Sequence, residues 1–328
     1  MKKFLAVVMF LVLVMALGVS AAMADYPDKA LTAICPWGAG GGTDSCLRAF
    51  CQALEKQLGQ TIIVDNKTGA GGVTGHEAIA DADPDGYTFG MITFEFVTYK
   101  ALDVSDYKSY VNYDPLCRLN ADPAGITVNK AWAEKNGIKD LADFIKYCKA
   151  HPGEVRMGGS SANSVWHIAG GYFMNVAGVE LKMVTYPDGA ASAVQAAAQG
   201  VDIEGVTVSL AEARSFIESG TLICLGLMAE ERINNKVFGN IPTCKEQGIN
   251  AFYSTWRGLG LPNGVDPAIK TKLADACKAA VKDPDFIQYM TNAGLGIAYM
   301  DAAEFKAFLE QQEEHDVPAA MKAAGIEI

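Results

Sequence analysis

The glycine-rich stretch from Cys35 to Arg48 has the composition of an anion-binding turn. Its sequence, CPWGAGGGTDSCLR, follows the apolar run Ala30–Ile34 and leads into Cys46–Leu58, where apolar residues recur at helical spacing. This pattern predicts a turn from a buried strand into a helix. Glycines let a ligand approach the backbone closely, and the first turn of a helix offers unpaired N–H groups at the positive end of its dipole. Such a turn can bind a carboxylate or a phosphate.

Two nucleotide-binding motifs are excluded for this stretch. A Walker loop requires Lys followed by Ser or Thr, whereas Thr43-Asp44 follows the glycines here. The dinucleotide fingerprint fails at its third glycine, where Thr43 stands. For this loop taken alone, a tight strand–helix connection that binds nothing is the alternative to an anion site.

Residues 1–24 have the pattern of a secretory signal peptide. Lys2 and Lys3 precede the apolar run Phe4–Leu17, and Ala22-Met23-Ala24 forms a cleavage site. A membrane anchor is the less favoured alternative, because the run is shorter than the roughly 20 residues that span a bilayer. We expect cleavage after Ala24 and a periplasmic mature chain.

Charge and cysteine content narrow the function further. The formal net charge of −11 argues against nucleic acid and anionic membrane surfaces as partners. An anion site must therefore work through local amides. None of the eight cysteines forms a CxxC or zinc-type spacing, so we expect most to be small buried residues, with one or two disulfides left open.

Alternating apolar runs and amphipathic stretches indicate α/β layers, and the length suggests two domains. The strands are expected near 31–35, 61–65, 87–92, 124–128, 155–158, 182–186, 202–206, 221–227 and 256–261. The helices are expected near 43–58, 73–82, 140–150, 163–177, 189–199, 208–218, 266–281, 284–292 and 302–324.

Further turns share the polar, small-residue character of the first one. They are Lys67–His76, Gly158–Gly170 and Tyr186–Ala191, each leading into an expected helix. Ligands in open α/β sheets bind beyond the carboxyl ends of the strands, where such turns lie. Ordinary helix capping explains each turn alone equally well, but their recurrence favours a shared cleft.

A longer series of short motifs runs through the mature chain in a fixed order. The motifs are Tyr26-Pro27-x-Lys29, Pro36-Trp37-x-Ala39-Gly40-Gly41-Gly42-Thr43-Asp44 with Arg48, Leu58-Gly59-Gln60, Gly69-Ala70-Gly71-Gly72, Pro84-Asp85-Gly86-Tyr87-Thr88, Pro152-Gly153, Gly159-Ser160 with His167, Tyr186-x-x-Gly189, Gly200-x-Asp202, Ser219-Gly220, Pro242-Thr243 and Trp256-x-Gly258. With this series the chain resembles the solute receptors of tripartite tricarboxylate transporters, also called Bug-type periplasmic receptors.

The resemblance implies an α/β, two-domain periplasmic-binding-protein fold of type II character. Domain 1 would comprise residues 25–124 and 250–328, and domain 2 residues 125–249, with a hinge of crossing strands and a ligand cleft between the domains. The ligand would be a small organic acid held by backbone amides, hydroxyls and ordered water. The implied binding residues are Trp37, Ala39, Gly40, Thr43, Thr93, Ser160, Ser161, Asn163, Ser164, Tyr186, Asp188, Gly189 and Ala190.

Departures from the family pattern bear on the ligand. Trp37 stands where members usually carry Phe or Tyr, and Asp188 stands where Lys is frequent. Asp188 in place of Lys disfavours a carboxylate at the far end of the ligand, or favours a ligand with an ammonium group. Glu95 and Glu204 are additional acids that can face the cleft, although solvated charges are the preferred interpretation. Asp44 is expected to be a helix-start carboxylate.

The residues favour a receptor over an enzyme. The four histidines are scattered and no nucleophile elbow is present. A pair of Ser164 and His167 is conceivable, but a packing or capping histidine is preferred, and Cys35 is expected to be a small buried residue. We predict a monomeric, non-enzymatic receptor without cofactor or metal that delivers its acid to the membrane subunits of a tripartite tricarboxylate-type transporter. A periplasmic hydrolase or transferase, and a ligand-sensing subunit for a membrane kinase, are the alternatives.

Overall fold

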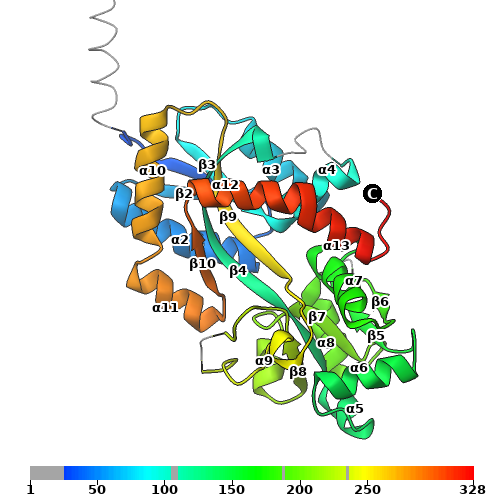
Figure 1. The fold of residues 1–328 in the computed structure, drawn as a ribbon. Helices are drawn as coiled ribbons and strands as arrows, with labels where there is room; N and C mark the ends of the chain where they lie inside the picture. Colours follow the sequence, from blue (N-terminus) through cyan, green and yellow to red (C-terminus); the bar gives the residue numbers. More distant parts are fainter. Residues whose placement is uncertain (1–25, 105–109, 187–188, 234–235) are drawn as a thin grey trace, which may run out of the picture. The chain divides into compact units, whose positions relative to one another are not determined.

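A computed structural model describes residues 26–104, 110–186, 189–233 and 236–328 (Figure 1). The expected signal peptide and the predicted binding residue Asp188 lie outside these residues. The chain divides into two compact units. The first unit takes its residues from Met1–Met91, Asn112–Cys117 and Leu259–Phe286, and the second from Ile92–Val111, Arg118–Gly258 and Ile287–Ile328.

Three strands contribute residues to both units: β3 (Thr88–Thr93), β4 (Tyr113–Asn129) and β9 (Ser254–Pro262). The resemblance implied crossing strands of this kind; that they form a hinge stays a prediction. The predicted domain limits at residues 125 and 250 stay a prediction.

The first unit is built on a parallel sheet. β1 (Leu31–Cys35) pairs with β2 (Ile62–Asn66) on one side and with β3 on the other. Its helical segments are α2 (Gly42–Leu58), η1 (Ala70–Gly72), α3 (Val73–Ala80) and α10 (Pro267–Ala280). Helix α2 buries Leu47, Phe50 and Leu54 at helical spacing, and α10 packs against it.

The second unit is a mixed sheet. β5 (Arg156–Gly158) lies between β6 (Lys182–Val184) and β7 (Gly205–Ser209), and these three strands run parallel. The long strand β4 runs antiparallel to β7, β8 (Leu222–Leu227) and β10 (Ile297–Met300). The interior of β7 is fully buried, which fits its run of β-branched residues.

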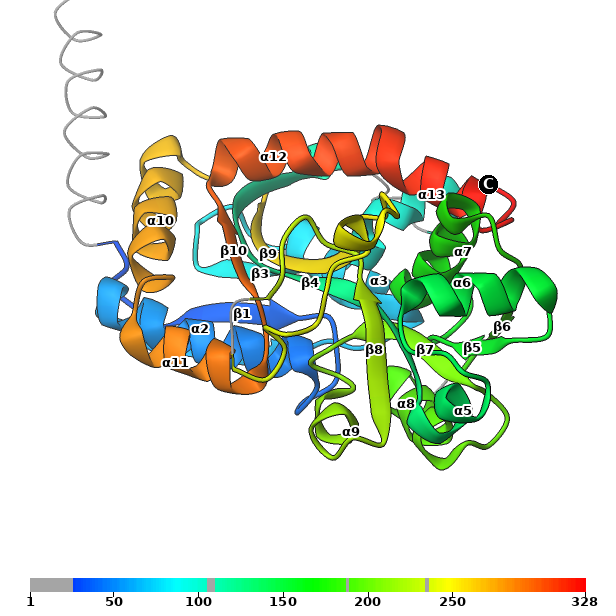
Figure 2. The same ribbon diagram turned by 60° about the horizontal axis from the view of Figure 1, so that its bottom comes forward.

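Helices surround this second sheet. They are η2 (Phe94–Thr98), α4 (Tyr99–Leu102), α5 (Lys130–Lys135), α6 (Leu141–Ala150), α7 (Val165–Ala177), α8 (Ala190–Gln199), α9 (Arg214–Glu218), η4 (Lys245–Gln247), α12 (Ala302–Gln311) and α13 (Val317–Ala323). Segments η3 (Tyr110–Asn112) and α11 (Pro284–Ala293) have residues in both units. Helix α7 contacts β7, and α8 contacts β5 and β7 (Figure 2).

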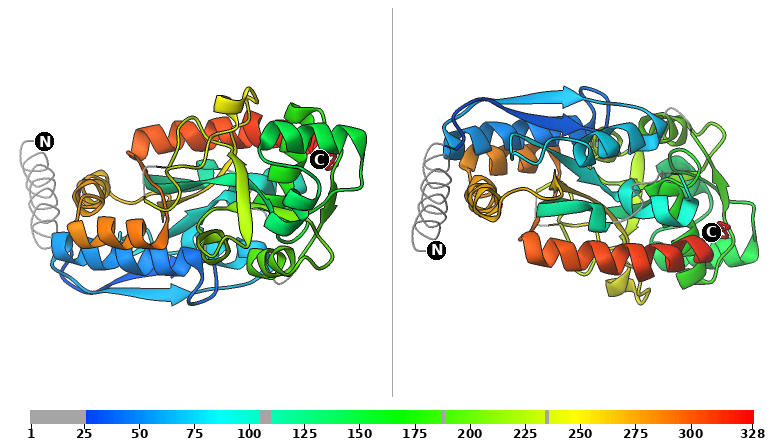
Figure 3. Two further views of the ribbon diagram at one scale, coloured as in Figure 1. Left: turned by 90° about the horizontal axis from the view of Figure 1, so that it is seen from below. Right: turned by 90° about the horizontal axis from the view of Figure 1, so that it is seen from above.

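A π-helical segment, η5 (Gln312–Asp316), joins α12 to α13. The three segments form one continuous helical run, visible in the right-hand view of Figure 3. The sequence predicted this run as a single helix over 302–324. Proline at position 318 lacks a backbone N–H, so the regular α-helical ladder is broken in the turn before it.

The α/β class and most predicted elements are confirmed, but five elements differ. The helix expected over 208–218 begins only at Arg214, because the apolar alternation of Val206 and Val208 belongs to β7. The first half of β4 was missed, since Pro115 and Pro123 interrupt its apolar pattern. Strand β10 and the short helices α4 and α5 were also missed, because segments of four to six residues carry little periodicity.

The cysteines behave as small core residues. All eight are free thiols, and seven of them are buried, with Cys224 partly so. Burial raises the pKa of the Cys148 and Cys244 thiols to about 12 and that of Cys224 to about 11.

We predict that native protein reacts with DTNB at pH 8 far more slowly than urea-unfolded protein. Rapid labelling of several thiols in the native state would contradict this burial.

Candidate ligand-binding site

The parallel strands of the second unit end at a common edge, which we call the carboxyl edge. It carries the loops that follow β5 at Gly158, β6 at Val184 and β7 at Ser209. Because β4 is antiparallel to β7, with Ala124 opposite Ser209, the stretch just before Ala124 lies at the same edge. Loops from several strands therefore meet there, as in ligand-binding α/β sheets.

The loop after β5 is held by its own serine and asparagine residues. The Ser160 hydroxyl donates to Ser164 Oγ at 2.6 Å, and Ser164 caps α7. Asn163 adopts φ 60°, a left-handed conformation that asparagine tolerates better than most residues. Neither Ser161 Oγ nor the Asn163 side-chain amide has a hydrogen-bond partner among the described residues. This loop therefore offers a hydroxyl and an amide to a ligand.

The same loop fixes His167 in a structural position. The Asn163 N–H donates to His167 Nδ1 at 3.0 Å, while the bond between His167 and Ser164 Oγ comes from the His167 backbone N–H, at 3.4 Å, and not from the ring. Burial lowers the pKa of His167 and keeps the ring neutral. The ring nitrogen that faces this loop is thus bonded to a backbone amide, as expected for a capping histidine.

The loop after β6 leads into helix α8, for which the described residues provide no side-chain cap. Gly189, the N-cap of α8, has φ 104°, which favours glycine, and none of the described side chains bonds to the α8 amides. By contrast, side chains cap α6, α7, α10 and α12. The first-turn amides of α8, starting at Ala190, are therefore open to an anion. The Tyr186 N–H donates to the Ser160 carbonyl at 3.0 Å, which ties this loop to the loop after β5.

The Tyr186 hydroxyl has no hydrogen-bond partner among the described residues. Burial and the charge of Asp202 raise its pKa, whereas Arg156 acts in the opposite direction. The hydroxyl therefore lies within electrostatic reach of Arg156, which forms an ion pair with Glu204 at 2.7 Å. Only 15% of the Glu204 side chain is exposed, so Glu204 is a charge paired with Arg156 and not the solvated charge that was preferred from the sequence.

In the first unit, the loop between β1 and α2 is held by Asp44. Its carboxylate accepts bonds from the Gly40 N–H at 2.8 Å, from Asn66 Nδ2 at 2.8 Å and from Arg48 Nε at 3.0 Å. Burial acts to raise the pKa of Asp44, but the bonds from Arg48 and Gly40 outweigh it and lower the pKa. Asp44 is the helix-start carboxylate that the sequence predicted.

The predicted binding residues of this first loop differ in accessibility. Ala39 and Gly40 are exposed, Trp37 is half-buried and Thr43 is buried. The Gly40 amide is already bonded to Asp44, so any ligand contact of this loop requires other amides. Gly41 caps α2 without a side-chain bond, which makes α2, like α8, a helix whose start lacks a side-chain cap.

Thr93, at the end of β3, belongs to a polar group that the sequence did not reveal. Its hydroxyl donates to Glu95 Oε2 at 2.8 Å. Burial raises the pKa of Glu95, while hydrogen bonds and the charge of Arg257 oppose the shift. The preferred interpretation of Glu95 as a solvated charge was therefore wrong. Its neighbours Phe94 and Phe96 are core residues, each at most 1% exposed.

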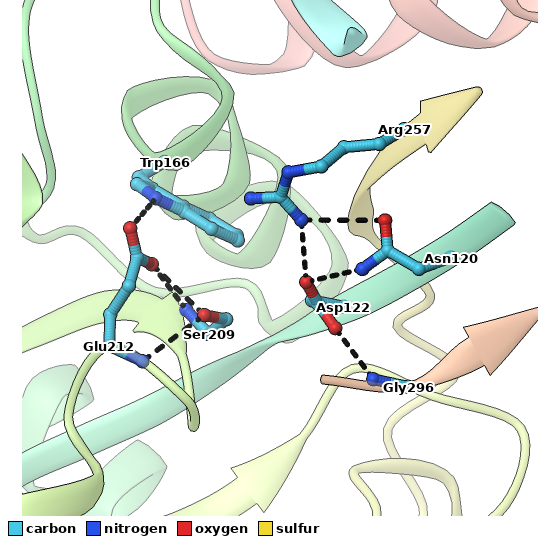
Figure 4. A network of polar contacts seen from close by, with 7 residues as sticks. All are labelled: Asn120, Asp122, Trp166, Ser209, Glu212, Arg257 and Gly296. Carbon is cyan, nitrogen blue, oxygen red and sulfur yellow. Dashed lines mark hydrogen bonds and ion pairs between the residues drawn. The ribbon is translucent and has the colours of Figure 1, made fainter. Parts of the chain in front are cut away.

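Arg257 is the centre of this polar group (Figure 4). It reaches from β9 towards β4, where its Nη1 lies 2.8 Å from Asp122 Oδ2 and 3.4 Å from Asn120 Oδ1. Asp122 also accepts bonds from Asn120 Nδ2 at 2.8 Å and from the Gly296 N–H at 2.9 Å. The pair is well shielded, with 13% of the Arg257 and 5% of the Asp122 side chain exposed.

Glu212 lies on the other side of Arg257, in the loop after β7. Its carboxylate accepts bonds from the Ser209 hydroxyl at 3.0 Å and from Trp166 Nε1 at 3.3 Å (Figure 4). Burial raises the pKa of Glu212, against the opposing effects of Ser209 and Arg257. Trp166 belongs to the first turn of α7, so Glu212 borders the loop after β5. Because Arg257 pairs with Asp122, the charges of Glu95 and Glu212 are not balanced by it. The polar group around Arg257 therefore carries an excess of negative charge.

The raised pKa of Glu212 predicts a pH-dependent effect on stability. A carboxyl group with a raised folded-state pKa contributes stability below its ordinary value of 4.5, and loses it as the pH rises through the folded value. We expect Glu212→Gln to increase the free energy of unfolding at pH 7 and to leave it nearly unchanged at pH 4, as measured by urea denaturation. Glu218→Gln, on the exposed Arg214 pair, is the control. Destabilisation at pH 7 alone would contradict the prediction.

Metal binding and membrane insertion find no support in the part of the chain that the structure describes. There, no group of three or more His, Cys, Asp or Glu side chains is arranged to hold a metal ion. None of the described helices is long and apolar enough to cross a bilayer.

Comparison with known proteins gives consistent matches along most of the chain. Residues 46–324 match the family model described as the tripartite tricarboxylate transporter family receptor. A UPF0065 protein in the gbd 5' region of Cupriavidus necator is 30% identical over 303 residues, covering 89% of this chain and 88% of the relative. Protein BugT of Bordetella pertussis is 29% identical over 276 residues, covering 82% and 81%.

Among solved structures, the chain is similar to a TctC solute binding protein from Polaromonas. The TM-score is 0.76 and the sequence identity 31%, with 92% of this chain and 98% of the other chain covered. A structure described as a periplasmic transporter has a TM-score of 0.75 and 28% identity, and covers 92% of this chain and 97% of its own.

Proposed function

Because the chain belongs to the tripartite tricarboxylate transporter receptor family, we propose that it is a periplasmic receptor for a small organic acid. It delivers this acid to the membrane subunits of a tripartite tricarboxylate-type transporter, acts as a monomer and has no catalytic role. The chain is a solute-binding protein with the two-domain α/β fold of its relatives, and the resemblance stated from its motifs is confirmed.

The start of α8 is the observation that carries the proposal. Among the described residues, no side chain caps its amides, and the Ser161 hydroxyl and Asn163 amide of the neighbouring loop have no partner. Backbone amides at a helix start, together with neutral donors, suit a carboxylate better than a cation. The proposed binding residues of this unit are therefore Ser160, Ser161, Asn163, Ser164, Tyr186, Gly189 and Ala190.

The remaining predicted binding residues complete the proposal. Trp37, Ala39, Gly40 and Thr43 of the first unit, and Thr93 and Asp188, are proposed on the family resemblance alone. Because the Gly40 amide is bonded to Asp44, the hydrogen bonds to the ligand at this position would come from the residues around Gly40 and not from its own amide. The excess negative charge of Glu95 and Glu212 favours a ligand with one carboxylate, or one that also carries an ammonium group.

A thermal-shift screen of the mature protein tests the proposal. The panel would contain mono-, di- and tricarboxylates, aromatic acids and amino acids, each with its uncharged amide as a control. A ligand at 100 times its dissociation constant adds about 2.7 kcal/mol of stability, so a binder raises Tm by several degrees. The absence of any shift, together with turnover of an ester that His167→Ala abolishes, would favour a hydrolase instead.

A further inference from the structure

The second unit contains a cavity that the proposed ligand site does not use. Its volume is about 790 Å³, within the range of small-molecule sites. None of the predicted binding residues lines it. Its wall is rich in aromatic rings and includes Arg118, Tyr172, Phe252, Tyr253, Phe308 and Gln312.

Arg118 is the cation of this cavity and has no carboxylate partner. Its Nε donates to the Ala298 carbonyl at 2.9 Å, and its guanidinium carbon lies 4.8 Å from the centre of the Phe308 ring. No carboxylate lies within ion-pair distance of it among the described residues. Burial lowers the pKa of Arg118, and Glu304 opposes this only through its charge. A partly buried guanidinium with unused N–H groups is stabilised by an anion.

Tyr253 contributes its ring to the same wall. The ring packs against Tyr172 at 5.5 Å and Phe94 at 5.8 Å between centroids. Its hydroxyl oxygen is buried away from the cavity, where the charge of Glu95 acts on it. Arg118 is therefore the group of this cavity that can bind an anion, and the rings of Tyr172, Tyr253 and Phe308 form an apolar wall.

We propose that this cavity is a second ligand site, for a monocarboxylate with an apolar body such as an aryl or medium-chain acid. Arg118 binds the carboxylate, and the aromatic wall buries the apolar body. Glu230 and Asp316 also line the cavity, and their charge disfavours a second carboxylate on the ligand. The π-helical segment η5 supplies Gln312 and Asp316, and such segments occur frequently at functional sites.

Titration of the mature protein with phenylacetate tests the proposal. Calorimetry should show binding to the wild type, at least tenfold weaker binding to Arg118→Met, and partial recovery in Arg118→Lys. Arg232→Met, which removes an exposed arginine paired with Glu246, should bind as the wild type does. Acetate lacks the apolar body and 2-phenylethanol lacks the charge, so each should bind at least tenfold more weakly than phenylacetate.

Two further variants make the test decisive. Phe252→Ala, which removes a half-buried ring from the cavity wall, should weaken phenylacetate binding several-fold; this arm holds even if Arg118→Met does not fold. Ala191→Asp, at the start of α8, should leave phenylacetate binding unchanged. The proposal is overturned if phenylacetate and octanoate both fail to bind the wild type. It is also overturned if Phe252→Ala binds normally, or if Ala191→Asp abolishes binding, which would place phenylacetate at the carboxyl edge.

Discussion

Arg257→Met is expected to lower the free energy of unfolding by about 3–5 kcal/mol, the range for breaking a buried ion pair. The substitution leaves Asp122 with only 5% of its side chain exposed and without its counter-charge. The bonds from Asn120 and the Gly296 N–H remain, but neutral donors compensate a buried carboxylate only in part. Urea denaturation at pH 7 measures the loss.

A matched variant and a double mutant make this result interpretable. Arg232→Met breaks an exposed pair with Glu246 and should cost at most about 1 kcal/mol. Adding Asp122→Asn to Arg257→Met should recover part of the lost stability, because the unpaired charge is then absent. If Arg257→Met costs no more than Arg232→Met, Arg257 does not neutralise a buried acid.

Ala191→Asp is expected to weaken ligand binding at least tenfold, about 1.4 kcal/mol, while stabilising α8 slightly. An acid in the first turn of a helix interacts favourably with the helix dipole. Here it would place a carboxylate beside the amides that we propose for the ligand. Ala191 is exposed, so the substitution disturbs no core. Calorimetric titration with an acid found in the thermal-shift screen measures the effect.

The chain provides a close control for this variant. Ala303 occupies the equivalent second position of α12, is also exposed and follows the side-chain cap Asp301. Ala303→Asp introduces the same charge at the same helical position and should leave the affinity unchanged. Equal affinities of the two variants would remove the start of α8 from the ligand site.

The parts of the molecule that the sequence predicted well depend on local patterns. The glycine-rich turn before α2 and the glycine before α8 stand directly beside apolar periodic segments, so both helix starts could be located from neighbouring residues alone. The role of Asp44 could be predicted for the same reason, because its partners Gly40 and Arg48 lie within one helical turn of it.

The polar group around Arg257 could not be predicted, because its members come from distant segments. Asn120 and Asp122 lie on β4, Glu212 follows β7, and Arg257 lies on β9. The pairing of β4 with β7 on one side and with β9 on the other brings these segments together. The single signal in the sequence was a charged residue within the apolar, glycine-spaced stretch Trp256–Pro262, where an arginine requires a buried partner.

Native mass spectrometry of the mature protein, purified without added ligand, tests the central claim most directly. The proposal predicts a fraction of molecules carrying one small organic acid, released on collisional activation, and loss of this adduct in Ala191→Asp but not in Ala303→Asp. Isothermal titration of the same acid into ligand-free protein should then give one saturable site. A protein that is free of adducts and binds no carboxylate in such titrations would contradict the assignment as an organic-acid receptor.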